Sequence, residues 1–105
     1  MIKTVITSKG NKTSSLFDPR FGRAEWFCIY DEDKEETSFV ENESQNTVHG
    51  AGRKAVEQIV ELGAGRVISG DFGPRSKELL DQFKIQMVVF QGEGMTIAEI
   101  IKKIK

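Results

Sequence analysis

The chain has few of the residues on which many small proteins depend. Its 105 residues include one cysteine, one histidine, two prolines and one tryptophan. A single cysteine cannot form an intramolecular disulfide, which excludes a disulfide-stapled scaffold and favours a reducing compartment. No apolar run approaches the ~20 residues of a membrane-spanning helix, and the first residues lack the apolar stretch of a secretory signal. We therefore expect a cytoplasmic protein, with one domain over residues 1–105 and no membrane partner.

An excess of charge of one sign is also missing, because the net charge is only −1. Residues 1–30 carry +3, residues 31–49 carry −6, and residues 50–105 carry +2. The chain lacks the basic excess of a nucleic-acid-binding protein, so we expect no nucleic-acid partner. The acidic block over 31–36 separates two apolar runs. We interpret it as a solvated hairpin turn, since its residues lack the spacing of a calcium-binding loop.

The pattern of apolar residues predicts five strands and three helices. The strands are expected where β-branched and aromatic residues cluster, over 2–8, 26–30, 37–41, 66–69 and 87–90. The helices are expected where apolar residues recur every three to four positions, over 50–62, 73–83 and 96–103. Thr96 and Glu99 have the spacing of a capping box at the start of the last helix.

The order of these elements predicts the fold class. The short acidic turn makes the second and third strands an antiparallel hairpin, whereas strand–helix–strand crossovers make the first, fourth and fifth strands parallel. The expected fold is α/β, with a five-stranded mixed sheet of order 3-2-1-4-5 and helices on its faces.

This topology brings four connections to one edge of the sheet, namely 9–25, 42–50, 70–74 and 91–95. Sheets that contain parallel strands bind ligands at the edge where the strands' carboxyl ends meet. The first connection has 17 residues, which exceeds the usual ~12–15 of a structureless loop and indicates a function. It is polar and has few apolar anchors besides Leu16, Phe17 and Phe21, so we expect residues 9–23 to be mobile without a ligand.

Basic residues at two helix starts break a local rule, because the positive end of the helix dipole favours acids. Arg53 and Lys54 fall in the first turn of one predicted helix, and Arg75 and Lys77 fall in the first turn of the next. Together with the bases and glycines of the neighbouring loops, they predict an anion-binding site. The alternative is that these long side chains simply extend into solvent.

The single histidine and the single cysteine are the candidate metal ligands. His49 directly precedes the first predicted helix, where the helix dipole disfavours imidazolium and leaves a neutral ring to bind a metal or a hydrogen-bonding partner. Cys28 lies within a strand, which favours a small buried hydrophobe and makes it the weaker metal candidate. No second cysteine or histidine gives the spacing of a structural zinc site.

Three segments together carry a family resemblance. They are Phe17 to Ala24 (FDPRFGRA) followed by aromatic Trp26 and Phe27, then His49 to Gly52 (HGAG), then Gly70 to Pro74 (GDFGP). Their order and spacing resemble the dinitrogenase iron–molybdenum cofactor-binding domain family, the type of the nitrogenase accessory proteins NifX and NafY and of the C-terminus of NifB. The resemblance covers essentially the whole chain.

This resemblance implies an RNase H-like three-layer fold and a non-catalytic carrier or scaffold for an anionic metal–sulfur cofactor. The implied cofactor is an iron–molybdenum cofactor or a related molybdenum-containing cluster, with a donor or acceptor protein in cluster assembly as partner. The positions that match the family loops or lie beside them are Arg20, Phe21, Gly22, Arg23, His49, Gly50, Gly52 and Arg53. The loops offer no further cysteine or histidine, so charge and backbone N–H groups would hold most of the cluster.

Two other function classes stay open at this point. A regulatory or interaction domain could keep the fold without a cofactor, because a fold alone does not fix function. An RNase H-like nuclease needs clustered carboxylates that hold two metal ions. Glu57 and Asp71 are available for that role, but the first predicted strand has no acid at all.

Overall fold

The computed structural model describes residues 3–105. Its elements, in chain order, are β1 (Lys3–Ser8), β2 (Trp26–Asp31), β3 (Glu36–Glu41), α1 (Ala51–Glu61), β4 (Arg66–Ser69), α2 (Pro74–Gln82), β5 (Gln86–Val89) and α3 (Ile97–Ile104). The expected first strand begins at residue 2, which lies outside the described residues. None of the helices in residues 3–105 has the length and apolar composition of a membrane span.

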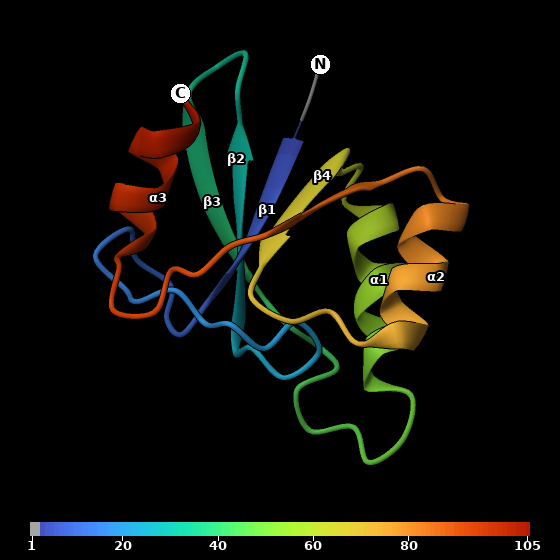
Figure 1. Cartoon of the computed structure of the whole chain (residues 1–105). Helices are drawn as coiled ribbons and strands as arrows, with labels where there is room; N and C mark the ends of the chain where they lie inside the picture. Colours follow the sequence, from blue (N-terminus) through green and yellow to red (C-terminus); the bar gives the residue numbers. More distant parts are fainter. Residues whose placement is uncertain (1–2) are drawn as a thin grey trace.

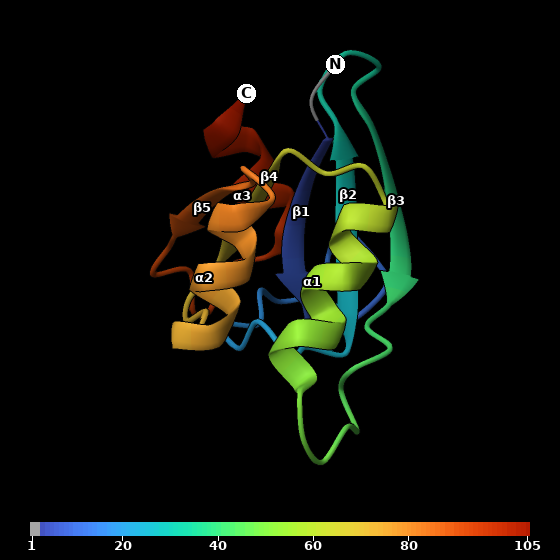
Figure 2. The ribbon, with the colours of Figure 1, turned by 90° about the vertical axis from the view of Figure 1, so that its right-hand side faces the viewer.

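The sheet has the predicted strand order, β3-β2-β1-β4-β5. β2 runs antiparallel to both β1 and β3, whereas β4 runs parallel to both β1 and β5. Helices α1 and α2 cover one face of the sheet and α3 covers the other (Figure 1). The view turned by 90° shows α1 and α2 side by side in front of the sheet (Figure 2). The predicted three-layer α/β fold is therefore confirmed.

Alternation along the strands gives each face of the sheet its own apolar core. Val5 and Val67 belong to the core under α1 and α2, whereas their neighbours Ile6 and Ile68 belong to the core under α3. All four side chains are at most 1% exposed. Full burial of such a side chain contributes about 1.5–3 kcal/mol, so these strands hold the centre of the sheet.

The helix ends follow the local signals in the sequence. Thr96 Oγ1 accepts a hydrogen bond from the Glu99 N–H at 3.2 Å, and Glu99 Oε1 accepts one from the Thr96 N–H at 2.9 Å, which confirms the capping box. Gly63 follows the end of α1 with a φ of 77°, a conformation in which glycine carries no steric penalty. Pro74 opens α2, because the missing N–H would have no intrahelical partner there.

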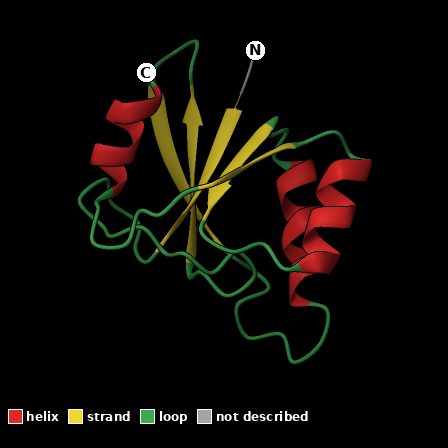
Figure 3. Ribbon diagram, in the orientation of Figure 1, coloured by secondary structure: helices red, strands yellow, loops and turns green. Residues whose placement is uncertain are grey.

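The connections lie where the topology predicts them. The carboxyl ends of β1, β3, β4 and β5 share one edge, and the loops 9–25, 42–50, 70–73 and 90–96 leave from it (Figure 3). We call this the carboxyl edge. It is the side of the molecule on which the predicted site residues of the loops gather.

Candidate functional site

The long loop 9–25 is fixed to the carboxyl edge through its second half. Bridges of the β type join Leu16 to Thr96 and Arg20 to Asp71. Phe17 and Phe21 are each 1% exposed. The expectation of a loop with few anchors is therefore wrong for residues 16–23, because pairing to other loops adds to the buried aromatic rings. Residues 9–15 are mostly exposed, but the carbonyl oxygens of Thr13 and Ser15 accept hydrogen bonds from the N–H groups of Ala98 at 2.8 Å and Ile97 at 2.9 Å. The mobility of residues 9–23 without a ligand stays a prediction.

Buried hydroxyl groups fix the middle of this loop to the sheet. Thr7 Oγ1 donates a hydrogen bond to the carbonyl oxygen of Asp18 at 2.5 Å. Ser69 Oγ lies 2.9 Å from Thr7 Oγ1 and 3.3 Å from the carbonyl oxygen of Pro19. That carbonyl also accepts hydrogen bonds from the N–H groups of Gly70 at 3.1 Å and Asp71 at 2.8 Å. The loop backbone is thus held by the ends of β1 and β4.

Arg20 has an internal partner that the sequence analysis did not identify. The carboxylate of Asp18, 0% exposed, accepts hydrogen bonds from Arg20 Nε at 3.0 Å, from Arg20 Nη2 at 2.9 Å and from the Arg20 backbone N–H at 2.9 Å. The hydrogen bond and the charge of Asp18 raise the pKa of the guanidinium group. The Arg20 side chain is 62% exposed, but its charge is balanced by a buried carboxylate.

Phe21, Gly22 and Arg23 form a turn between this loop and β2, and each has a different task. The Phe21 ring packs on Phe72, with 5.3 Å between ring centroids, and on Phe27 at 6.2 Å. A Cβ on Gly22 would lie 3.4 Å from the backbone nitrogen of Gly52, an ordinary contact distance, so the turn lies directly against the start of α1. Arg23 Nη1 donates hydrogen bonds to carbonyl oxygens of the loop 42–50.

The starts of α1 and α2 meet at the carboxyl edge. A Cβ on Gly52 would lie 2.3 Å from Ser76 Oγ, so the first turns of the two helices touch. The capping positions are Gly50, with a φ of 74°, and Gly73, also at 74°, and no side chain caps either helix. Neither first turn contains an acid. The first-turn N–H groups of both helices therefore have no capping side chain as acceptor, in contrast to the fully capped α3, although the N–H of Gly73 itself donates to Asp71 Oδ1.

The two candidate metal ligands have opposite environments. His49 is exposed, between Val48, which is 80% exposed, and Gly50. Cys28 is 0% exposed in the core under α3, and burial raises the pKa of its thiol to about 12. Metal ligation uses the thiolate form, which this buried environment disfavours. Cys28 is thus the small buried hydrophobe of the first interpretation.

Basic residues exceed acidic ones around the carboxyl edge, but ion pairs reduce the excess. The four loops and the first turns of α1 and α2 contain eight basic and five acidic residues. Arg53 pairs with Glu57 at 3.5 Å, and Arg75 pairs with Glu78 at 3.4 Å. Within residues 3–105, no ion pair involves the exposed Lys9, Lys12, Lys54 or Lys77. The available positive charge therefore lies mainly on lysines, two of them at the starts of α1 and α2.

The loop 42–50 is held by residues that the sequence analysis missed. Asn42 and Ser44, both 0% exposed, place Nδ2 and Oγ at 3.2 and 2.9 Å from the carbonyl oxygen of Gly22. Asn42 Oδ1 also accepts a hydrogen bond from the Ser44 N–H at 3.0 Å. The available signal was the asparagine itself directly after a strand, because asparagine commonly bonds to the backbone two residues on.

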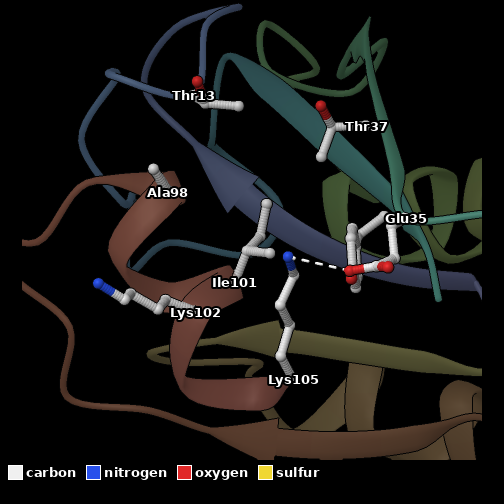
Figure 4. Close-up of a pocket in the computed structure, with 8 residues that line it drawn as sticks. Thr13, Glu35, Thr37, Ala98, Ile101, Lys102 and Lys105 are labelled. Atoms are coloured by element: carbon white, nitrogen blue, oxygen red, sulfur yellow. Dashed lines mark ion pairs between the residues drawn. The ribbon is translucent and has the colours of Figure 1, made fainter.

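Several hollows in the described part of the chain lie outside the cluster formed by the starts of α1 and α2, and two of them are considered as alternative sites. One, of about 330 Å³, lies at the carboxyl edge and is lined by Lys9, Arg20 and Glu93 among others. The other, of about 380 Å³, lies between α3 and the β2–β3 hairpin, where Lys105 pairs with Glu35 at 3.1 Å (Figure 4). Neither is lined by a histidine or a cysteine. Among residues 3–105, no group of three or more His, Cys, Asp or Glu side chains could hold a metal ion.

Comparisons with known proteins find relatives of this chain in sequence and in structure. A model of the family described as dinitrogenase iron–molybdenum cofactor matches residues 1–105. The apo form of the orange protein from Desulfovibrio gigas is similar, with a TM-score of 0.91 and 30% identity, over 99% of this chain and 87% of that one. A candidate NifB protein from Thermotoga, solved by NMR, has a TM-score of 0.84 and 33% identity over the same shares. An uncharacterized protein of Methanocaldococcus jannaschii is 28% identical over 97% of this chain and 84% of its own length.

Proposed function

The chain belongs to the dinitrogenase iron–molybdenum cofactor family, and from that premise we propose that it binds and carries an anionic metal–sulfur cluster without transforming it. The observation that carries this proposal is the meeting of two helix starts that no side chain caps. Helix N-termini attract anions through their N–H groups and dipole. Each start also bears an exposed lysine, Lys54 or Lys77, where local preference favours an acid. The site is therefore suited to a ligand with negative charge.

The donor set fits a cluster that brings its own sulfide ligands. His49 is the one exposed imidazole beside these helix starts, and it is the candidate for direct contact with a metal or sulfide. The N–H groups of residues 51–53 and the ammonium groups of Lys54 and Lys77 would neutralise the remaining charge. Arg53 adds to this field, since an exposed ion pair such as its contact with Glu57 is worth only about 0.2–1 kcal/mol.

This role assigns different tasks to the other predicted site residues. Arg20 is committed to the buried carboxylate of Asp18. Phe21 anchors the loop, Gly22 lies in the turn against the start of α1, and Gly52 allows close packing of α1 on α2. Gly50 provides the left-handed backbone that turns the chain into α1. A carrier of this kind also needs a donor or acceptor protein for the cluster.

The nuclease alternative has less support. β1 lacks an acid, and Glu57 is paired with Arg53. The Asp71 carboxylate accepts a hydrogen bond from the Gly73 N–H at 3.2 Å at the start of α2. Two-metal chemistry needs carboxylates around ions about 3.5–4 Å apart, and the described residues contain no such group. A regulatory domain without a cofactor is the competing proposal that the binding experiment separates.

The test is an anaerobic titration of tetrathiomolybdate, an anionic metal–sulfur probe, with protein-bound molybdenum measured after equilibrium dialysis. We expect saturable binding that weakens as salt is added, because the attraction is electrostatic. Substituting His49→Ala should lower affinity about tenfold, the loss of one interaction of about 1.4 kcal/mol. Lys54→Gln and Lys77→Gln should each lower it about twofold to fivefold.

Lys102→Gln is the matched control, because it removes the same charge from α3 on the opposite face of the sheet. Its affinity should equal that of the wild type. Absence of saturable binding by the wild type would defeat the carrier proposal in favour of a domain without a cofactor. Equal losses in Lys54→Gln and Lys102→Gln would show attraction by overall charge rather than by this site.

A further inference from the structure

We infer that Arg23 is a positioning residue for His49, fixing the loop that carries the imidazole instead of contacting the bound anion. This inference rests on the proposed function for its purpose, but the contacts that support it involve only this chain. Position and charge alone assign Arg23 to the anion. The hydrogen bonds of its guanidinium group indicate another role.

The guanidinium group is directed at carbonyl oxygens. Arg23 Nη1 donates to the carbonyl oxygen of Gln45 at 3.3 Å and to that of Thr47. Thr47 lies two residues before His49 in the chain. A charged donor shared by two carbonyl oxygens fixes the direction of the backbone that leads to the imidazole.

This contact is the last in a series of ties between the Phe21–Glu25 turn and the loop. The Gly22 carbonyl oxygen lies within hydrogen-bonding distance of Asn42 Nδ2 and Ser44 Oγ, and the Asn42 N–H donates to the carbonyl oxygen of Glu25 at 3.0 Å. After Thr47, within the described part of the chain, no hydrogen bond joins residues 48 and 49 to another element. The position of His49 therefore depends on the Arg23 contact before it and on the start of α1 after it.

Arg23 could contact the anion or position the loop, and these two roles predict different affinities and salt dependences when residues of the loop are substituted. If Arg23 contacts the anion, a substitution there weakens the dependence of affinity on salt, and an uncharged change elsewhere in the loop has no effect. If Arg23 positions the loop, an uncharged substitution that loosens the same loop also lowers affinity. Ser44→Ala is that matched substitution, because it removes the Ser44 Oγ contact with the Gly22 carbonyl oxygen, 2.9 Å long, without changing the charge.

The experiment compares wild type, Arg23→Ala and Ser44→Ala in two measurements. The first is amide hydrogen exchange without any ligand, read at Gln45 and Thr47, whose N–H groups donate to the carbonyl oxygens of Asn42 and Ser44, and, as a check of the fold, at residues 4–7 in β1. The second is affinity for tetrathiomolybdate at two salt concentrations. We expect Arg23→Ala to speed exchange at Gln45 and Thr47 about tenfold with no change in β1. Both variants should lose affinity severalfold, with the salt dependence of the wild type.

Wild-type exchange rates at Gln45 and Thr47 in Arg23→Ala would overturn the inference. So would a weaker salt dependence in Arg23→Ala together with wild-type affinity in Ser44→Ala, since that pair of results assigns Arg23 to the anion. Failure of the wild type to bind the probe would defeat the proposed function alone, because the exchange measurement tests the Arg23 contact without a ligand.

Discussion

Substitution of Gly52 by alanine tests the contact between the starts of α1 and α2, on which the proposed site depends. The new Cβ would lie 2.3 Å from Ser76 Oγ, and Ser76 is 3% exposed, so the hydroxyl has little room to turn away. Overpacking of this kind costs about 1–3 kcal/mol. Replacing glycine in a helix by alanine returns about 0.5–1 kcal/mol. We therefore expect Gly52→Ala to lower the free energy of unfolding by about 0.5–2 kcal/mol.

The sign of this effect should reverse once the hydroxyl is gone. In a Ser76→Ala background the nearest side-chain atom is Ser76 Cβ at 3.7 Å, an ordinary contact distance. Gly52→Ala should then stabilise the protein by about 0.5–1 kcal/mol, a rise in Tm of roughly 2–8 °C. Urea unfolding of the four proteins of this double-mutant cycle measures the difference. The reasoning is wrong if Gly52→Ala has the same effect with and without the Ser76 hydroxyl.

Two further predictions concern the loop and the core. Gly70→Ala would place a Cβ 2.6 Å from Pro19 Cβ and 2.9 Å from Pro19 Cα. Because the Pro19 carbonyl also accepts two backbone hydrogen bonds, we expect urea unfolding to show a free energy of unfolding lowered by roughly 2–4 kcal/mol. A decrease under about 0.5 kcal/mol would contradict the contact. Burial raises the pKa of the Cys28 thiol to about 12, so the unfolded chain, with a thiol pKa of about 8.5, loses this proton first. Wild-type stability should therefore fall between about pH 9 and 11, by up to ~1.4 kcal/mol per pH unit more than that of Cys28→Ala. If stability fell with pH at the same slope in the wild type and in Cys28→Ala, the thiol would be in contact with water and this reasoning would be wrong.

The fold could be predicted because several local signals agree with one another. The acidic turn at 31–36, the capping box of Thr96 and Glu99, and Pro74 at a helix start each mark a boundary by chemistry that acts within a few residues. Crossover rules then leave few topologies for this order of elements. The burial of β5 differs from what its apolar sequence predicts. Val89 is 57% exposed, because β5 lies at the edge of the sheet.

The gathering of the loops at the carboxyl edge could be predicted, but the contacts of their arginines could not. Charge patterning marks Arg20 and Arg23 as bases of a loop at this edge, yet it carries no information about which acceptor each guanidinium meets. Arg20 meets Asp18 only because the loop buries that carboxylate. Arg23 meets carbonyl oxygens of a loop 22–24 residues further along the chain. Such tertiary contacts depend on how two irregular loops pack together, and neither has a periodic pattern.

The most direct test of the carrier proposal is to map where the probe binds. Amide proton–nitrogen NMR spectra of the labelled protein, recorded during anaerobic addition of diamagnetic tetrathiomolybdate, report on each backbone N–H. The account predicts saturable shifts concentrated at residues 49–54 and 75–77, the starts of α1 and α2, with the backbone N–H of His49 shifting together with them. Shifts concentrated around Glu35 and Lys105 in the hollow of Figure 4, or no saturable shift at all, would contradict it.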